Sequence, residues 1–197
     1  MHQDVPPTTV YAIKQGIVKS YNLTSHGEEK PISFSTEGQI FPLGWVFGKL
    51  HRAQYYYEAF SDCVLYRVPP DDYLNFLKQN PDVMFLTLDR VVANLLNHQM
   101  RINALGQSKA SKKVLHTLHF LALSFGHDLR PDVVEIPLPF TQQDLANVMG
   151  LTRETTSTEL KKLVTQGVIF YKSHSYVVRS DKLNDLLDDE YGHRLIR

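Results

Sequence analysis

The alternation of apolar and polar residues in the C-terminal third has the period of two short helices separated by a glycine. The first helix has one apolar face, which consists of Leu145, Ala146, Val148 and Met149. Gly150 follows, and glycine readily adopts the left-handed backbone conformation that ends a helix and turns the chain. The pattern therefore predicts a helix that ends at Gly150.

A second helix is predicted over about residues 152–164. Thr152 occupies an N-cap position, and the inward face consists of Leu160, Leu163 and Val164. The outer side then begins with Arg153, Glu154, Ser157 and Thr158. A helix inserted in the major groove of DNA reads bases with residues at its N-terminal end. We interpret the pair as a helix-turn-helix; two packed surface helices with incidental charges are the alternative.

A β-hairpin is predicted directly after the second helix. Gly167 breaks the helix, and two β-rich runs follow at Val168–Tyr171 and Tyr176–Arg179. The polar link between them carries Lys172 and His174, so the hairpin has a basic tip. A wing in this position can lie on a phosphate backbone, which favours DNA binding over a plain packing unit.

The N-terminal part has a different pattern, in which short runs of Tyr, Ile, Val and Phe alternate with glycines. The runs are Val10–Ile13, Ile17–Tyr21, Ile32–Phe34 and Tyr55–Phe60. Such runs with turn residues between them predict a small antiparallel β-roll. The aromatic residues in and between them fit two interpretations, the core of the roll or the lining of an apolar effector pocket; the pocket candidates are Phe41, Trp45, Phe47 and Tyr56.

A long helix is predicted between these regions, because apolar residues recur at alternating steps of four and three. The members of this seam are Met84, Leu88, Val91, Leu95, His98, Ile102 and Leu105. A heptad seam is typical of a helix that pairs with another, and a helix from Pro81 to Leu105 would run about 36 Å at 1.5 Å per residue. We predict a dimer axis. His98 either sets the register, responds to protons, or is simply hydrogen-bonded.

Composition changes this picture in one respect. Net charge is zero, with 21 basic and 21 acidic residues. The segment from Thr152 to Arg179, however, contains more basic than acidic residues. Its five basic residues are Arg153, Lys161, Lys162, Lys172 and Arg179, and its two acidic residues are Glu154 and Glu159. The predicted DNA-facing part is therefore locally basic.

Several classes of protein are not expected from this sequence. The single cysteine, Cys63, excludes an internal disulfide framework and a four-cysteine iron–sulfur cluster, and we expect it in the core. His116 and His119 lack a third ligand at a fixed offset, so no metal site and no cofactor are predicted. No catalytic Ser-His-Asp or Cys-His arrangement can be proposed, so we do not expect an enzyme. With no membrane span or signal-peptide core, we expect a cytoplasmic, bacterial protein.

The C-terminal motif resembles a known family. Residues 151–163, Leu-Thr-Arg-Glu-Thr-Thr-Ser-Thr-Glu-Leu-Lys-Lys-Leu, preceded by Phe-Thr-Gln-Gln-Asp-Leu-Ala, are similar to the winged helix of the Crp/Fnr transcription regulators. Tyr11-x-Ile13, His26-Gly27-Glu28 and Glu37-Gly38-Gln39 follow the strand and turn order of the family's cyclic-nucleotide-binding-like roll. The family usually has further strands before Tyr11, so the roll is either reduced or incomplete in this sequence.

The resemblance implies an α+β fold with three parts. These are an N-terminal antiparallel β-roll of the cyclic-nucleotide-binding type at 1–78, a dimerisation helix and hinge at 79–107, and a winged helix-turn-helix at 108–197. It also implies a homodimeric transcription regulator that binds an inverted-repeat site. The alternative is a winged-helix module that binds proteins and has no sequence-specific DNA binding.

The resemblance also implies roles for individual residues. Thr152 and Lys172 would contact phosphates, while Arg153 and Glu154 would read G·C pairs. Ser157 matches the Fnr-like branch, whereas Thr158 departs from the family, because many members place a guanine-reading arginine there. The full predicted DNA-binding set is Thr141, Gln142, Thr152, Arg153, Glu154, Ser157, Thr158, Lys161, Lys172 and His174.

The residues that would bind an effector differ from those of the family. A cyclic-nucleotide pocket of the family uses a Gly-Glu pair for the ribose and an Arg-Ser pair for the phosphate. The matching stretch, 41–48, has no glutamate, and no Arg-Ser follows it. A phosphate buried without its arginine would be an uncompensated charge, so cyclic AMP is not expected. An unknown small molecule or no effector at all both stay open, and RNA polymerase is a candidate further partner.

Overall fold

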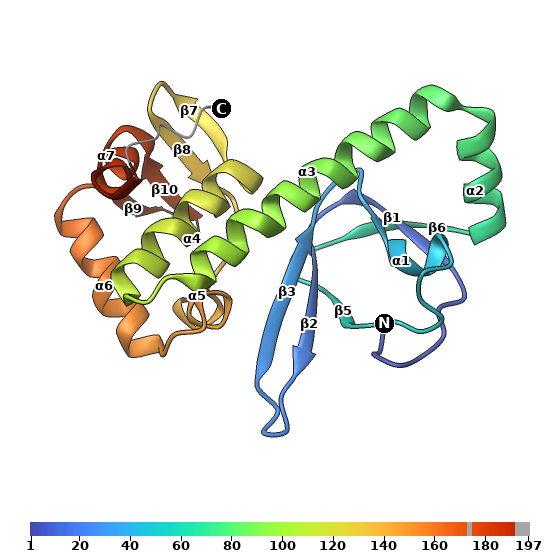
Figure 1. Ribbon diagram of the computed structural model, residues 1–197, viewed down its shortest axis with the longest axis horizontal. Helices are drawn as coiled ribbons and strands as arrows, with labels where there is room; N and C mark the ends of the chain where they lie inside the picture. Colours follow the sequence, from blue (N-terminus) through green and yellow to red (C-terminus); the bar gives the residue numbers. More distant parts are fainter. Residues whose placement is uncertain (173–174, 192–197) are drawn as a thin grey trace. The chain divides into compact units, whose positions relative to one another are not determined.

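The computed structural model describes residues 1–172 and 175–191, the last four of them by their backbone (Figure 1). The chain divides into two compact units, Met1–Ala93 and Asn94–Arg197. The division falls within a long helix, α3, which spans Pro81–Gly106. The boundaries predicted for the three parts, at 78 and 107, stay a prediction.

Unit 1 contains two three-stranded antiparallel sheets, with strand orders β4-β1-β6 and β3-β2-β5. The strands are β1 Val10–Gln15, β2 Val18–Leu23, β3 Glu29–Ser35, β4 Ile40–Phe41, β5 Tyr56–Ala59 and β6 Val64–Val68, and the short helix α1 is Leu43–Val46. The four predicted strand runs are thereby confirmed. The antiparallel roll folds as its alternating pattern indicated.

The core of unit 1 is small and aromatic. Ile13, Val18 and Phe41 form its buried cluster. The Phe41 ring stacks on Tyr11 at 5.3 Å and on Tyr57 at 5.1 Å between centroids. Cys63 packs against the same cluster, and its thiol lies 3.2 Å from the carbonyl oxygen of Ile17. The cysteine is therefore part of the core packing, as expected.

One glycine of unit 1 is required by its surroundings. Gly16 joins β1 to β2 with φ +92, and a Cβ atom built there would meet the backbone oxygen of Asp62 at 2.2 Å. No other residue fits both the positive φ and the close approach.

Two helices end unit 1 and lead into unit 2. Helix α2, Pro70–Gln79, begins with a proline and carries Asp71 and Asp72 in its first turn. Proline at the start and acidic residues beside the positive end of the helix dipole are a recognisable start signal, although sequence reasoning did not use it. Helix α3 follows directly and confirms the predicted long helix.

Unit 2 is a helical domain on a four-stranded antiparallel sheet with strand order β7-β8-β10-β9 (Figure 1). Its elements are α4 Ala110–Phe125, β7 His127–Arg130, β8 Val133–Ile136, α5 Gln142–Met149, α6 Arg153–Thr165, β9 Ile169–Lys172, β10 Ser175–Arg179 and α7 Ser180–Tyr191. The predicted helix pair and hairpin strands are confirmed. Strands β7 and β8 were not predicted.

The core of unit 2 is larger and mainly aliphatic. Helix α4 supplies an apolar face to this core, since Val114, Leu118 and Leu121 are at most 1% exposed. Leu145 and Met149 of α5 are 0% exposed and pack into the same unit. Within the described residues, no helix has the length and apolar character to cross a membrane.

Candidate DNA interface

Helix α5 is fixed at both ends by local chemistry. The Thr141 hydroxyl oxygen accepts from the Asp144 backbone N–H at 3.1 Å, and the Thr141 N–H donates to the Asp144 carboxylate at 2.8 Å. This capping box satisfies N–H groups that have no partner inside the helix. Gly150 ends the helix in the left-handed conformation with φ 63, as predicted. The turn between α5 and α6 is therefore set by the sequence.

Helix α6 begins with a threonine cap. The Thr152 hydroxyl oxygen accepts from the Thr155 N–H at 3.2 Å, and its proton is donated to the Thr155 hydroxyl at 2.8 Å. The inner face of the helix consists of Thr156, Leu160 and Leu163, all buried. Val164 was expected to face inward, which is wrong: it is 48% exposed. Around the helix axis, Val164 lies at the edge of the arc formed by the buried residues Thr156, Leu160 and Leu163, on the side of Lys161.

The outer face of α6 presents most of the predicted base-reading residues. Arg153, Glu154 and Thr158 are exposed, and Ser157 is half-buried. They occupy the first two turns of the helix, where a major-groove helix contacts bases. The structure thus brings these four residues together on one helix end.

Lys161 and Lys162 have different electrostatic surroundings. Lys162 pairs with Glu159 at 2.7 Å, so its charge is compensated on its own helix. The Lys161 ammonium makes no ion pair with any residue in the described ranges; its backbone oxygen accepts from the Thr165 hydroxyl at 3.0 Å. Of these two lysines, Lys161 is therefore the one whose charge an anionic partner can use.

A serine next to the tip of the hairpin ties the wing to strand β8. Strands β9 and β10 pair with Lys172 opposite Ser175, and the Ser175 hydroxyl oxygen lies 2.8 Å from the Lys172 carbonyl and 2.5 Å from a Glu135 carboxylate oxygen. The Ser175 hydrogen bond, with the nearby His127, keeps the pKa of Glu135 below its ordinary value. Lys172 is exposed at the end of β9, while His174 lies outside the described residues.

Helix α3 exposes nearly all of its apolar side chains. The predicted seam residues are exposed as follows: Met84 44%, Leu88 54%, Val91 38%, Leu95 58%, Ile102 69% and Leu105 38%. His98 is also exposed, and its Nδ1 lies 2.6 Å from the Asn94 carbonyl oxygen. Contiguous exposed apolar side chains of this kind mark contact surfaces.

The four aromatic candidates for an effector pocket do not share one environment. Phe41 is 6% exposed in the core stack, and Tyr56 stacks on Tyr21 at 5.4 Å. Trp45 is half-buried in α1, whereas Phe47 is 45% exposed. The pocket stays a prediction, and Phe41 at least contributes to the core.

His116 and His119 lie side by side on the buried face of α4, each 7% exposed. Burial, together with the neighbouring charge of His116, lowers the pKa of His119. In the part of the chain that the structure describes, no three metal-ligating side chains come together.

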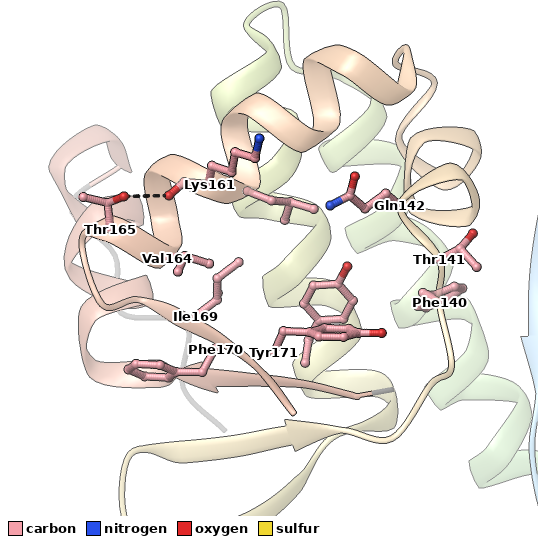
Figure 2. Close-up of a pocket in the computed structure, with 11 residues that line it drawn as sticks. Phe140, Thr141, Gln142, Lys161, Val164, Thr165, Ile169, Phe170 and Tyr171 are labelled. Carbon is pink, nitrogen blue, oxygen red and sulfur yellow. Dashed lines mark hydrogen bonds between the residues drawn. The ribbon is translucent and has the colours of Figure 1, made fainter. Parts of the chain in front are cut away.

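Sequence reasoning missed a cavity of about 560 Å³ in unit 2 (Figure 2). It lies between α6, strand β9 and the segment that leads into α5, and Lys161, Val164 and Tyr171 belong to its lining. The segments that form it are separated in sequence, so no local pattern indicates it. The available signal in the sequence was the pair of adjacent aromatic residues, Phe170 and Tyr171, in a predicted strand. The structure shows that both are exposed.

A β-roll followed by a winged helix with an exposed, polar recognition helix is the architecture of a DNA-binding regulator. The comparisons agree with this class. Residues 1–80 match the cyclic nucleotide-binding domain, and residues 112–186 match the Crp-like helix-turn-helix domain. The chain is 30% identical over 173 residues to the nitrogen fixation regulation protein FixK of Azorhizobium caulinodans, covering 88% of this chain and 68% of that one.

Further relatives fit the same assignment. The transcriptional regulator ArcR of Staphylococcus haemolyticus is 30% identical over 168 residues, covering 82% of this chain and 72% of the relative. The solved structure of FixK2 from Bradyrhizobium japonicum shares the fold with a TM-score of 0.74 at 24% identity, covering 94% of this chain and 90% of that one. The chain belongs to the Crp/Fnr family of DNA-binding transcription regulators, which are not enzymes.

Proposed function

We propose that this chain binds an inverted-repeat DNA site as a homodimer, with one α6 helix in the major groove of each half-site. The observation that carries the proposal is the exposure of Arg153 and Glu154 in the first turn of α6. A guanidinium contacts guanine O6 and N7 together, and a carboxylate accepts from the cytosine amino group. This pair suits a half-site that contains G·C pairs.

Phosphate contacts position the helix. Lys161 and Lys172 supply exposed ammonium groups, and Thr141, Gln142 and Thr152 lie at the starts of α5 and α6. Helix N-termini attract phosphate through their free N–H groups. On DNA, the Thr152 hydroxyl proton turns from Thr155 to a phosphate oxygen, while its oxygen still accepts from the Thr155 N–H. The cap and the phosphate contact are therefore compatible.

Helix α3 supplies the dimer interface of this proposal. Its exposed seam recurs at heptad spacing, and pairing with the same seam of a second chain would remove it from water. His98 lies within the seam as its polar member.

The proposed effector is not cyclic AMP. The segment Phe41–Gly48 contains no acidic residue and no arginine, and the Phe41 side chain is part of the core stack. The residues present therefore do not fit a cyclic nucleotide, whose phosphate requires a cationic partner. Regulation then depends on a different ligand or on the abundance of the protein. We place it in the bacterial cytoplasm with its DNA, and RNA polymerase is a further proposed partner.

The experiment compares two arginine-to-alanine variants on the duplex that the wild-type protein enriches from random sequence. Arg153→Ala should lose binding by about 1–3 kcal/mol per half-site, because a bidentate base contact is removed. Arg130→Ala removes the same charge from exposed strand β7, outside the predicted interface, and should retain nearly full affinity. Equal losses for both variants would contradict base reading by Arg153 and favour the protein-binding alternative.

A further inference from the structure

The cavity in unit 2 has a buried floor and an open rim. Its floor is formed by Phe140, Leu160, Ile169 and Tyr176, each at most 6% exposed. Its rim includes Val164, Phe170 and Tyr171, which are 48%, 47% and 59% exposed. Figure 2 shows Lys161, Val164 and Thr165 of α6 on one side, Ile169, Phe170 and Tyr171 on the opposite side, and Phe140, Thr141 and Gln142 beside them.

The size and lining of this cavity fit a small molecule. Ligand pockets usually measure about 300–1,000 Å³, and this one measures about 560 Å³. Tyr171 and Tyr176 meet edge to face, with ring centroids 5.2 Å apart and an interplanar angle of 66°. Aromatic faces and edges of this kind attract another aromatic ring beyond the gain from apolar burial. The floor therefore favours a flat, apolar ring system.

The charge of the lining favours an anionic ligand. Among the described lining residues Lys161 is the one charged group, and no acidic residue accompanies it. Its ammonium makes no ion pair with a described residue, in contrast to Lys162, which Glu159 compensates. Burial and the neighbouring Tyr171 raise the pKa of Tyr176 to about 12, so its hydroxyl keeps its proton near neutral pH. The polar groups at this cavity are cationic or able to donate.

We propose that this cavity binds a flat aromatic carboxylate, with its rings on the floor formed by Leu160, Ile169 and Tyr176 and its carboxylate on the Lys161 ammonium. Charge-assisted hydrogen bonds are about twice as strong as neutral ones, so the carboxylate contributes to affinity as well as to orientation.

Ligand binding has a consequence for DNA that rests on the proposed function. Lys161 and Gln142 are also predicted DNA contacts, so a carboxylate on Lys161 would remove a cation from the phosphate-binding surface. The aromatic acid should therefore weaken DNA binding. Binding to the cavity itself does not depend on DNA and can be measured without it.

The test uses naphthoate and its neutral isostere naphthamide, titrated into the full chain without DNA by isothermal titration calorimetry. Naphthoate should bind at one site, and naphthamide should bind about tenfold more weakly, because it lacks the charge-assisted contact. Absence of saturable naphthoate binding overturns the proposal. Equal affinities for both compounds overturn the role of Lys161.

Variants then locate the site. Lys161→Met should reduce naphthoate affinity about tenfold and leave naphthamide affinity unchanged, whereas Lys162→Met, its matched control, should change neither. Val164→Trp should abolish binding of both compounds, because the indole fills the cavity from an exposed rim position; its melting curve checks that the chain is folded. Naphthoate binding that survives both Lys161→Met and Val164→Trp places the ligand elsewhere and overturns the proposal. A failure to find a DNA site would leave these results unaffected.

Discussion

Helices α6 and α3 expose opposite kinds of side chain. Helix α6 buries both of its leucines and exposes an arginine, a glutamate and two lysines, with Val164 at the edge of its buried face. Helix α3 instead exposes most of its aliphatic residues, and Ala104 is its one buried residue within the described chain. The exposed surface of α6 suits a charged polymer whose phosphates and base edges form hydrogen bonds. The exposed surface of α3 suits another apolar surface, such as the same helix in a second chain. The difference supports the proposed division of roles, in which α6 reads the bases and α3 pairs the two chains.

The largest expected effect comes from breaking the apolar surface of α3. Leu95→Asp should raise the dimer dissociation constant by about 10²–10⁴-fold, because two leucines lose a burial worth about 1.5–3 kcal/mol each. Sedimentation equilibrium measures this change. Ala93→Asp places the same charge on an exposed position of α3 away from the seam and should leave the dimer intact. A dimer that survives Leu95→Asp would contradict pairing through this seam.

A second change tests whether residue 158 of α6 contacts the bases. Thr158→Arg should add a contact to guanine worth about 1–3 kcal/mol per half-site and shift the selected sequence toward G·C at that position. Thr165→Arg adds the same charge at the far end of α6 and should strengthen binding without changing the sequence preference. Selection of sites by both variants, at one salt concentration, distinguishes these outcomes. An unchanged preference with Thr158→Arg would show that residue 158 does not face the bases.

The turn that places α6 can be tested separately from its charges. Gly150→Ala should cost about 1–2 kcal/mol of stability, because φ 63 is unfavourable for a residue with a Cβ atom, although a Cβ at this position meets nothing within 4 Å. Gly106→Ala at the end of α3 also meets nothing within 4 Å and has no positive φ, so it should not destabilise the chain. Urea unfolding measures both. Equal stability of the two variants would contradict the strain argument.

The smallest expected effect concerns pH. Because burial lowers the pKa of His119 in the folded state, the unfolded chain binds this proton at higher pH than the folded chain. Stability should therefore be unaffected by this group above the ordinary histidine pKa of about 6.5 and should decline as pH falls below it. His119→Gln should flatten that decline, and His26→Gln, at an exposed turn position, should not. Thermal melts between neutral and mildly acidic pH show the difference; parallel declines in all three proteins would contradict it.

Features with a local cause were predictable from the sequence. Gly150, the Thr152 cap and the heptad seam act over a few residues, so their patterns indicated α5, α6 and α3 correctly. Strand β7 was missed because all four of its residues are exposed, which leaves no alternation to detect. Val164 was misplaced because a helical period does not show where the edge of the buried arc falls. The cavity of unit 2 joins separate segments through tertiary folding, which no local period encodes.

The most direct test of the central claim is selection of the wild-type protein on a pool of random duplexes at about 0.15 M salt, where non-specific phosphate attraction is partly screened. Two α6 helices held by one α3 pair should enrich an inverted repeat with G·C-containing half-sites about one helical turn apart. Enrichment of a single, unrepeated half-site would contradict the dimer. Enrichment of no motif at all would contradict sequence-specific reading by α6.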